Sequence, residues 1–171
     1  MKTITIDTLF GPETLTVPHR CIKFKQIKVT METLEVREEA VQYFRADHRY
    51  TSPAHVAEIF SFLHNEVKEH FFAVHLDGKN RILALDLVSV GSLNQTIVHP
   101  REVFKTALGS SSAAALFLVH NHPTGDPSPS AEDIAITRRL KEAGDLLGVR
   151  VLDHIIVGTD GYLSFVERGL L

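Results

Sequence analysis

The spacing of apolar positions predicts helices alternating with strands from residue 51 onward. Helices are expected where apolar residues recur at intervals of three and four, and strands where apolar runs are short and bounded by turn residues. In chain order, the predicted elements are a helix over 53–63, strands over 69–76 and 81–90, a helix over 101–108, a strand over 113–122, a helix over 131–147, and strands over 149–157 and 162–166. This order favours an α/β domain with a mixed β-sheet flanked by helices.

Turn and capping residues mark several of these boundaries. Ser52 before Pro53 is an N-cap followed by proline at the first helical position. Asp77-Gly78 between two apolar runs predicts a tight hairpin turn. Gly109 and Gly148 are placed to end the helices that precede them.

The first fifty residues follow a different pattern. Alternating Thr, Ile and Val residues, interrupted by Gly11-Pro12 and Pro18, predict two or three short strands over residues 1–31. A helix is predicted over 33–47. We therefore divide the chain into a strand-rich extension, residues 1–50, and a second domain, residues 51–171.

Composition narrows the class of protein. A net charge of −3 gives no electrostatic reason to expect nucleic acid as the main partner. The single cysteine, Cys21, excludes an internal disulfide framework and a cysteine-based zinc cluster. No segment resembles a signal peptide or a membrane span, so we expect a cytoplasmic protein with no membrane partner.

The residues richest in chemistry are 120–133, HNHPTGDPSPSAED. His120 and His122 lie two apart on a predicted strand, so their side chains share one face. Asp133 lies in the first turn of the next predicted helix and can supply a third metal ligand. Two imidazoles and one carboxylate leave one position of a tetrahedral ion for water. Three prolines, at 123, 127 and 129, stiffen the loop between the ligands.

Each part of this pattern also has an ordinary structural interpretation. A His-x-His pair arises by chance in a histidine-rich chain. Ser130 and Asp133 form the S-x-x-D pattern of a helix capping box. A carboxylate turned toward a metal is not fully available to cap a helix, so capping and metal binding are expected to exclude each other in part.

The complete pattern, His120-x-His122-Pro123, six residues, then Ser130-x-x-Asp133, resembles the JAMM motif of the JAB/MPN metalloprotease superfamily. The blocks VHPREVF at 98–104, LVHNHPTGDPSPSAEDIAITRRLKEAG at 118–144 and VLDHIIVG at 151–158 are similar to the RadC family, a bacterial branch of that superfamily. The resemblance implies a JAB/MPN domain with a cytidine-deaminase-like fold.

The resemblance also implies the chemistry of the site. His120, His122 and Asp133 would bind Zn²⁺, with water as the fourth ligand. Ser130 would donate a hydrogen bond to that water or to the developing oxyanion. Glu69 would take a proton from the water and pass it to the leaving group. The implied activity is that of a zinc-dependent metallopeptidase or isopeptidase acting on a peptide or protein substrate. Mn²⁺, Fe²⁺ and Co²⁺ are also compatible with these ligands.

Several assignments stay open. Glu66, Asp86 and Glu102 compete with Glu69 as the general base. Asp153-His154, inside an apolar strand, is either a buried structural pair or a support for the site. Asn121 is expected to point away from the ligands and to be structural.

Two other classes of function compete with a hydrolase. One is a DNA-repair-associated DNA-binding protein or nuclease, although the letters HNH at 120–122 do not form the dispersed nuclease motif. The other is a non-catalytic interaction module on the same fold, from which the ligands would be expected to be missing. A deaminase is disfavoured because the zinc-deaminase signature combines H-x-E with P-C-x-x-C, and the only cysteine, Cys21, is far from any such motif. The substrate and the oligomeric state are not predicted.

Overall fold

The structure is a computed structural model that describes residues 52–91, 98–110 and 112–171. Its elements are α3 (Pro53–Ile59), the 3₁₀ helix η1 (Phe60–Asn65), β1 (Glu69–Leu76), β2 (Ile82–Gly91), α4 (Pro100–Gly109), β3 (Ala115–Asn121), α5 (Ala131–Leu147), β4 (Arg150–Gly158) and β5 (Gly161–Ser164). The elements predicted over 1–31 and 33–47, and Cys21, lie outside the described residues. The domain division at residue 50 therefore stays a prediction.

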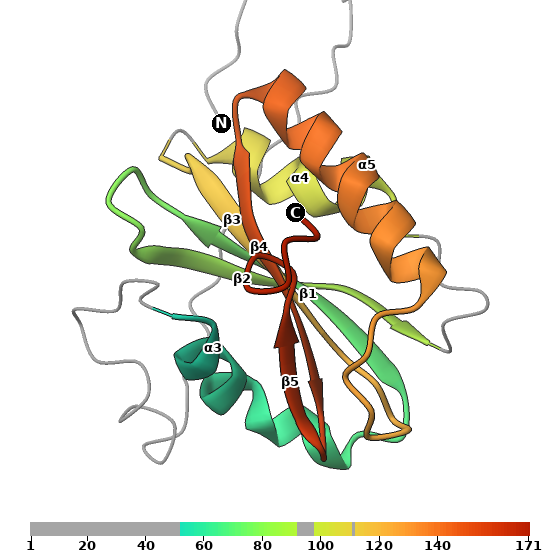
Figure 1. Ribbon diagram of the computed structural model, residues 1–171. Coiled ribbons are helices and arrows are strands. Elements are labelled where there is room, and N and C mark those ends of the chain that lie inside the picture. The colour runs from blue at the N-terminus through green and yellow to red at the C-terminus, as the bar shows by residue number, and fades with distance from the viewer. Residues whose placement is uncertain (1–51, 92–97, 111) are drawn as a thin grey trace, which may run out of the picture. The chain divides into compact units, whose positions relative to one another are not determined.

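A five-stranded mixed sheet forms the centre of the described domain (Figure 1). Its strand order is β2-β1-β3-β4-β5. Strands β3 and β4 are parallel, and the other neighbouring pairs are antiparallel. The α5 helix connects the two parallel strands, as such a crossover requires. The predicted α/β class and mixed sheet are confirmed.

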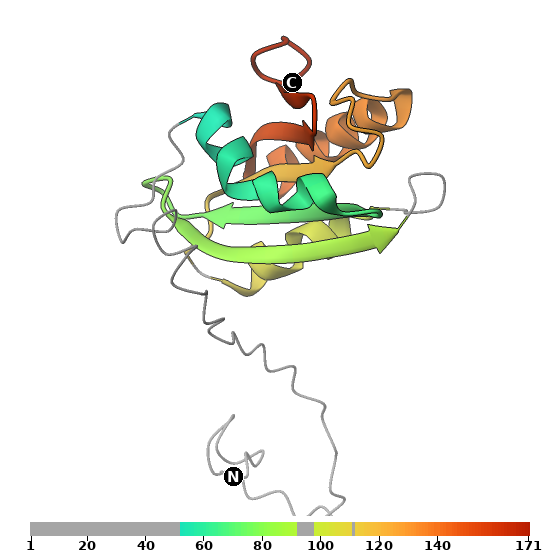
Figure 2. The same ribbon diagram turned by 90° about the horizontal axis from the view of Figure 1, so that it is seen from below.

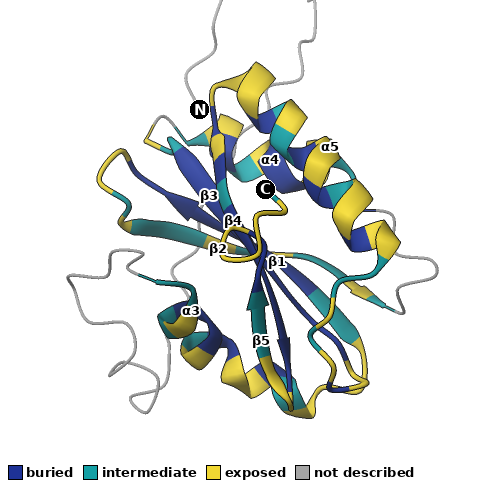
Figure 3. Ribbon diagram, in the orientation of Figure 1, coloured by how far each residue is buried: buried dark blue, intermediate teal, exposed yellow. Residues whose placement is uncertain are grey.

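Helices cover both faces of the sheet and create two apolar cores. Helices α3 and α4 lie on opposite sides of the sheet (Figure 2). One core contains Val56 of α3 together with Phe60 and Leu63 of η1. The other contains Phe104 of α4 and Leu140 of α5. Every residue of β3 is buried between these layers (Figure 3).

The α5 helix has the predicted bounds and both predicted caps. Ser130 is its N-cap, and Gly148 at its C-terminus adopts a left-handed conformation with φ 71°. None of the helices in the described part of the chain is long and apolar enough to cross a membrane.

The first predicted helix, over 53–63, is wrong in its second half. Ser52 caps α3 by accepting a hydrogen bond from the His55 amide, as expected. After Ile59, however, the backbone tightens into the 3₁₀ helix η1. Phe60 and Leu63 are three residues apart, a spacing that also aligns side chains on one face of a 3₁₀ helix. The apolar pattern alone therefore does not distinguish the two helix types.

The hairpin between β1 and β2 is confirmed, with the predicted Asp77-Gly78 pair in its turn. The last facing strand residues are Leu76 and Ile82. The Asp77 carboxylate accepts hydrogen bonds from the amides of Lys79 and Arg81 and thereby organises the loop. The positive φ falls on Asn80, at 60°. The Asp77-Gly78 pair therefore starts the turn without completing it.

Candidate metal centre

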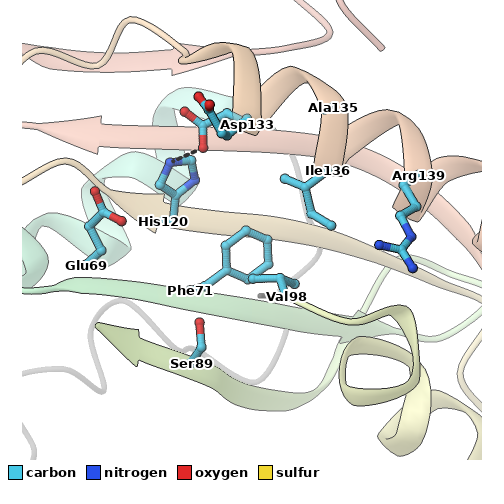
Figure 4. A pocket seen from close by; sticks show the side chains of 10 residues that line it. Glu69, Phe71, Ser89, Val98, His120, Asp133, Ala135, Ile136 and Arg139 are labelled. Carbon is cyan, nitrogen blue, oxygen red and sulfur yellow. Dashed lines mark ion pairs between the residues drawn. The ribbon is translucent and has the colours of Figure 1, made fainter. Parts of the chain in front are cut away.

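The three predicted ligands, His120, His122 and Asp133, converge at the end of β3 and are called the ligand cluster. His120 is in β3, His122 lies just beyond its last residue, and Asp133 is in the first turn of α5. His120 Nε2 is 3.0 Å from His122 Nε2 and 3.2 Å from Asp133 Oδ1. His122 Nε2 is 3.4 Å from Asp133 Oδ2. All three residues are buried, and one ligand atom from each lies within 4.8 Å of the others, so the group could hold a metal ion. Figure 4 shows two of them, His120 and Asp133.

The His122 ring is oriented by the proline-rich loop. Its Nδ1 donates a hydrogen bond to the Asp126 carbonyl oxygen at 2.8 Å. The loop is held against the β4–β5 turn, where the Asp160 amide donates to the Gly125 carbonyl. A Cβ on Gly158 would lie only 2.1 Å from that carbonyl oxygen, so this close approach requires glycine. The hydrogen bond at Nδ1 leaves Nε2 directed toward His120 and Asp133.

A buried chain of hydrogen bonds orients the His120 ring. Thr137 Oγ1 donates to the Asp133 carbonyl oxygen at 2.5 Å. The hydroxyl must therefore accept from His154 Nδ1, which is also at 2.5 Å. With its proton on Nδ1, neutral His154 accepts at Nε2 from His120 Nδ1, 2.8 Å away. The remaining His120 nitrogen, Nε2, then carries a lone pair directed at the ligand cluster.

The pKa shifts of the histidines are compatible with binding of a cation by the ligand cluster. Burial lowers the pKa of His120 and lowers that of His154 well below its ordinary value, which keeps both rings neutral. Burial also acts to lower the pKa of His122, but hydrogen bonds to Asp133 and Asp126 outweigh it and raise that pKa. Without a metal, a proton on His122 therefore separates nitrogens that would otherwise repel each other. Metal binding would release that proton, as ligand deprotonation requires.

Asp133 caps α5 and faces the histidines at the same time. Its Oδ2 accepts hydrogen bonds from the Ser130 amide at 2.8 Å and the Ser130 hydroxyl at 2.6 Å. Its Oδ1 faces His120. Burial opposes ionisation of Asp133, but its contacts with the His120 and His122 rings and with the Ser130 hydroxyl lower the pKa of the carboxyl. The carboxylate therefore caps the helix through Oδ2 while Oδ1 faces His120 and Oδ2 also faces His122. The partial exclusion of capping and metal binding stays a prediction.

Glu69 opens β1 and lines a pocket beside the ligand cluster. The pocket has a volume of about 310 Å³, and His120 and Asp133 also line it (Figure 4). Burial raises the pKa of the Glu69 carboxyl to about 7, against the attraction of His122. A carboxyl that titrates near neutral pH can both accept and return a proton.

The competing carboxylates have other partners and do not line this pocket. Asp86 accepts a hydrogen bond from the Thr106 hydroxyl. Glu102 forms an ion pair with Lys105 on the surface of α4. Glu66 lies 4.0 Å from the His70 ring. Of the four candidates, the structure brings only Glu69 to the ligands.

Comparison with known proteins identifies the family. Residues 50–170 match the model of the RadC-like JAB domain. The chain belongs to the RadC family.

RadC-family relatives in several bacteria share more than half of the aligned residues with this chain. A UPF0758 protein of Pelobacter propionicus is 62% identical over 127 residues, which cover 72% of this chain and 54% of that relative. A UPF0758 protein of Geotalea uraniireducens is 60% identical over 132 residues, which cover 75% of this chain and 56% of that relative. A UPF0758 protein of Geobacter sulfurreducens is 53% identical over 150 residues, which cover 87% of this chain and 65% of that relative. The chain therefore spans little more than half the length of the first two relatives. The family places the domain in the JAB/MPN superfamily, which includes metalloproteases.

In this RadC-family chain, Asn121 links the ligand strand to the strand that carries Glu69. Its side chain is buried, and its Oδ1 accepts from the His70 amide at 2.8 Å. Its Nδ2 donates to the Lys68 carbonyl oxygen at 3.1 Å. These two bonds fix the backbone on either side of Glu69. The structural role predicted for Asn121 therefore includes positioning Glu69, which the sequence did not indicate.

The Asp153-His154 pair divides between two tasks. The Asp153 carboxylate accepts from the Ser164 hydroxyl at 2.6 Å and the Val166 amide at 3.1 Å, which secures the C-terminal segment. His154 contacts His120 instead. The sequence signal was a polar pair inside an apolar strand, and of its two interpretations His154 follows the site-supporting one. Thr137 was missed, although it lies four residues after Asp133 and so on the same helix face.

Proposed function

We propose that this chain is a JAMM-type metal-dependent hydrolase that cleaves an amide bond, as a metallopeptidase or isopeptidase, with Glu69 as general base. One observation carries the proposal. Glu69, with a pKa raised to about 7, lines the same pocket as His120 and Asp133. A non-catalytic interaction module would have no need for complete ligands beside a desolvated carboxyl group.

The metal assigned to the site is zinc, held by His120, His122 and Asp133. A zinc ion bound there would polarise the amide carbonyl and lower the pKa of a water molecule to about 7. Mn²⁺, Fe²⁺ and Co²⁺ suit the same nitrogen and oxygen donors. The Nδ1 hydrogen bonds of both histidines support this assignment, because they leave each Nε2 directed at the other ligands.

The chain's own groups then carry the proton. Glu69 removes a proton from water as the water oxygen attacks the amide carbon. As the carbon–nitrogen bond breaks, Glu69 delivers that proton to the leaving nitrogen, so the products are a carboxylic acid and an amine, which exchange a proton at neutral pH to give a carboxylate and an ammonium ion. Asn121 holds the backbone on both sides of Glu69 during this transfer. Ser130, whose hydroxyl lies 2.6 Å from Asp133 Oδ2, would turn that hydroxyl toward the oxyanion.

The pocket wall beside these groups suits part of a peptide. Phe71, Val98 and Ile136 supply an apolar surface between β1 and α5. An apolar wall with a few polar groups at one end is typical of a pocket that holds a substrate side chain. We therefore assign a peptide or protein substrate.

The test is a comparison of Glu69→Gln with Glu66→Gln in the zinc-loaded chain. A degenerate peptide pool is incubated with each protein, and new termini are detected by mass spectrometry. We expect Glu69→Gln to retain about one metal ion per chain and to lose activity by at least about 100-fold, the contribution of general acid–base catalysis. Glu66→Gln is expected to match the parent. Equal turnover by the parent and Glu69→Gln would refute the assigned base.

A further inference from the structure

The pocket beside the ligand cluster has two chemically different ends. Glu69, His120 and Asp133 form one end, and Arg139 of α5 lies at the other (Figure 4). Apolar residues occupy the space between the ends, with Phe71 on the sheet side and Ile136 on α5 (Figure 4). A peptide with one end at the ligand cluster would therefore lie along an apolar wall and extend toward the Arg139 guanidinium.

Arg139 has the properties of a binding group. It lies on α5 between Ile136 and Ala143, both partly buried against the core, and its side chain extends toward the sheet side of the pocket (Figure 4). Within the described ranges, no carboxylate forms an ion pair with it. Guanidinium groups bind carboxylates in a planar, bidentate geometry. Arg139 therefore presents its donors to the pocket.

The helix fixes the spacing between the two ends. Asp133 and Arg139 are six residues apart on α5, which corresponds to about 9 Å along the axis at about 1.5 Å per residue. An extended peptide advances about 3.3 Å per residue, so about 9 Å spans two to three residues. An anionic group that reaches Arg139 would thus lie two or three residues from an amide at the ligand cluster.

We propose that Arg139 forms a subsite for a substrate carboxylate two or three residues from the scissile amide. This inference rests on the proposed hydrolase function and names its substrate class: short peptide segments that carry a carboxylate. The carboxylate is either the C-terminus of the peptide or an acidic side chain. The binding chemistry at Arg139 is the same for both.

Glu132 also lines the pocket, and its charge affects where in the pocket a carboxylate can bind. It lies in the first turn of α5, seven residues and about 10 Å along the axis before Arg139. A carboxylate close to the ligand cluster would meet repulsion from Glu132 and Glu69. A carboxylate near Arg139 avoids this repulsion and gains an ion pair, so the charged side chains that line the pocket favour an anion beside Arg139.

The test measures binding, so that it does not depend on turnover. Zinc-loaded Glu69→Gln protein is titrated calorimetrically with acetyl-Ala-Ala-Ala, its C-terminal amide, and acetyl-Ala-Ala-Glu-amide. The same titrations are made after Arg139→Met and after Arg138→Met. Arg138 is the adjacent arginine on α5 and is exposed like Arg139, but it does not line the pocket, so it is a matched control.

We expect at least one of the two carboxylate peptides to bind more tightly than the neutral amide. We expect that preference, the affinity for the carboxylate peptide divided by that for the neutral amide, to fall by about fivefold to tenfold in Arg139→Met. It should be unchanged in Arg138→Met. Which peptide is preferred distinguishes a C-terminal from a side-chain carboxylate. A preference that survives Arg139→Met would place the carboxylate on the metal and overturn the subsite, as would binding that does not favour a carboxylate. If the parent protein has no peptidase activity, the proposed hydrolase function is refuted, but these binding affinities are unaffected.

Discussion

At the scale of single residues, the ligand cluster depends on groups that do not belong to it. His154 and Thr137 lie behind His120, and their hydrogen bonds decide which His120 nitrogen carries a lone pair. This chain of hydrogen bonds ends on the backbone carbonyl of Asp133, itself a proposed metal ligand. The orientation of His120 and the position of Asp133 are thus coupled through two buried side chains.

Thr137→Val tests this coupling with little change in volume. The substitution removes the acceptor of His154 and the donor to the Asp133 carbonyl, so His120 is no longer held in one tautomer. We expect zinc affinity, measured by competition with a chelator, to fall by about 10- to 100-fold.

Thr106→Val is the matched control for that experiment. Thr106 is also a helical threonine with a side-chain hydrogen bond, but its partner is Asp86. Its replacement should leave zinc affinity unchanged. Equal zinc affinities for Thr137→Val and the parent would show that the hydrogen-bond chain does not prepare the site.

At the scale of secondary-structure elements, the start of α5 both caps the helix and carries the proposed metal ligand Asp133. The capping box between Ser130 and Asp133 fixes the first turn of the helix. The same turn brings the Asp133 carboxylate to the two histidines. The helix therefore cannot be restarted one residue away without moving a ligand.

Ser130→Ala separates the capping role of this serine from its proposed catalytic role. Ser52 is the N-cap of α3 and also accepts a hydrogen bond from a backbone amide, so Ser52→Ala provides the comparison. Both substitutions should lower the free energy of unfolding by about 1 kcal/mol in urea titrations. Only Ser130→Ala should also reduce peptide turnover. If the two variants hydrolyse peptide equally well, Ser130 acts only as a cap.

The sequence predicted these elements unevenly, for physical reasons. The bounds of α5 were predictable because strong local signals, a capping box and a following glycine, lie at its two ends. The change from α3 to η1 was not, because apolar residues three apart fit both helix types. The convergence of His120, His122 and Asp133 was predictable because these residues lie close together in sequence. The contact between His120 and His154 depends on the pairing of β3 with β4, which local sequence does not determine.

At the scale of the whole described domain, the sheet brings distant residues to one place. Strands β1, β3 and β4 are neighbours, so Glu69, His120 and His154 meet although they are far apart in sequence. The neighbouring strand order also places His75 of β1 beside Asp86 of β2, away from the ligand cluster. This second buried histidine links stability to pH.

His75 should make the fold less stable in acid. It is fully buried, and neither ring nitrogen has a hydrogen-bond partner among the described residues. Burial lowers its pKa from the ordinary 6.5, so below that pH the unfolded chain binds a proton at His75 that the native chain does not. The stability contributed by neutral His75 is therefore present above about pH 6.5 and is lost as the pH falls toward the native pKa.

His75→Leu should remove this part of the pH dependence. Urea unfolding at several pH values between about 7.5 and about 5.5 should show the variant gaining stability relative to the parent as the pH falls. A difference between His75→Leu and the parent that does not change with pH would contradict the assigned cause.

The most direct test of the central claim is anomalous diffraction at the zinc edge from crystals of the zinc-loaded protein. We predict a strong peak at about 2.0–2.2 Å from His120 Nε2, His122 Nε2 and an Asp133 carboxylate oxygen, with Glu69 facing the remaining coordination position. A zinc peak bound by other residues, or none at these three ligands, would contradict the account.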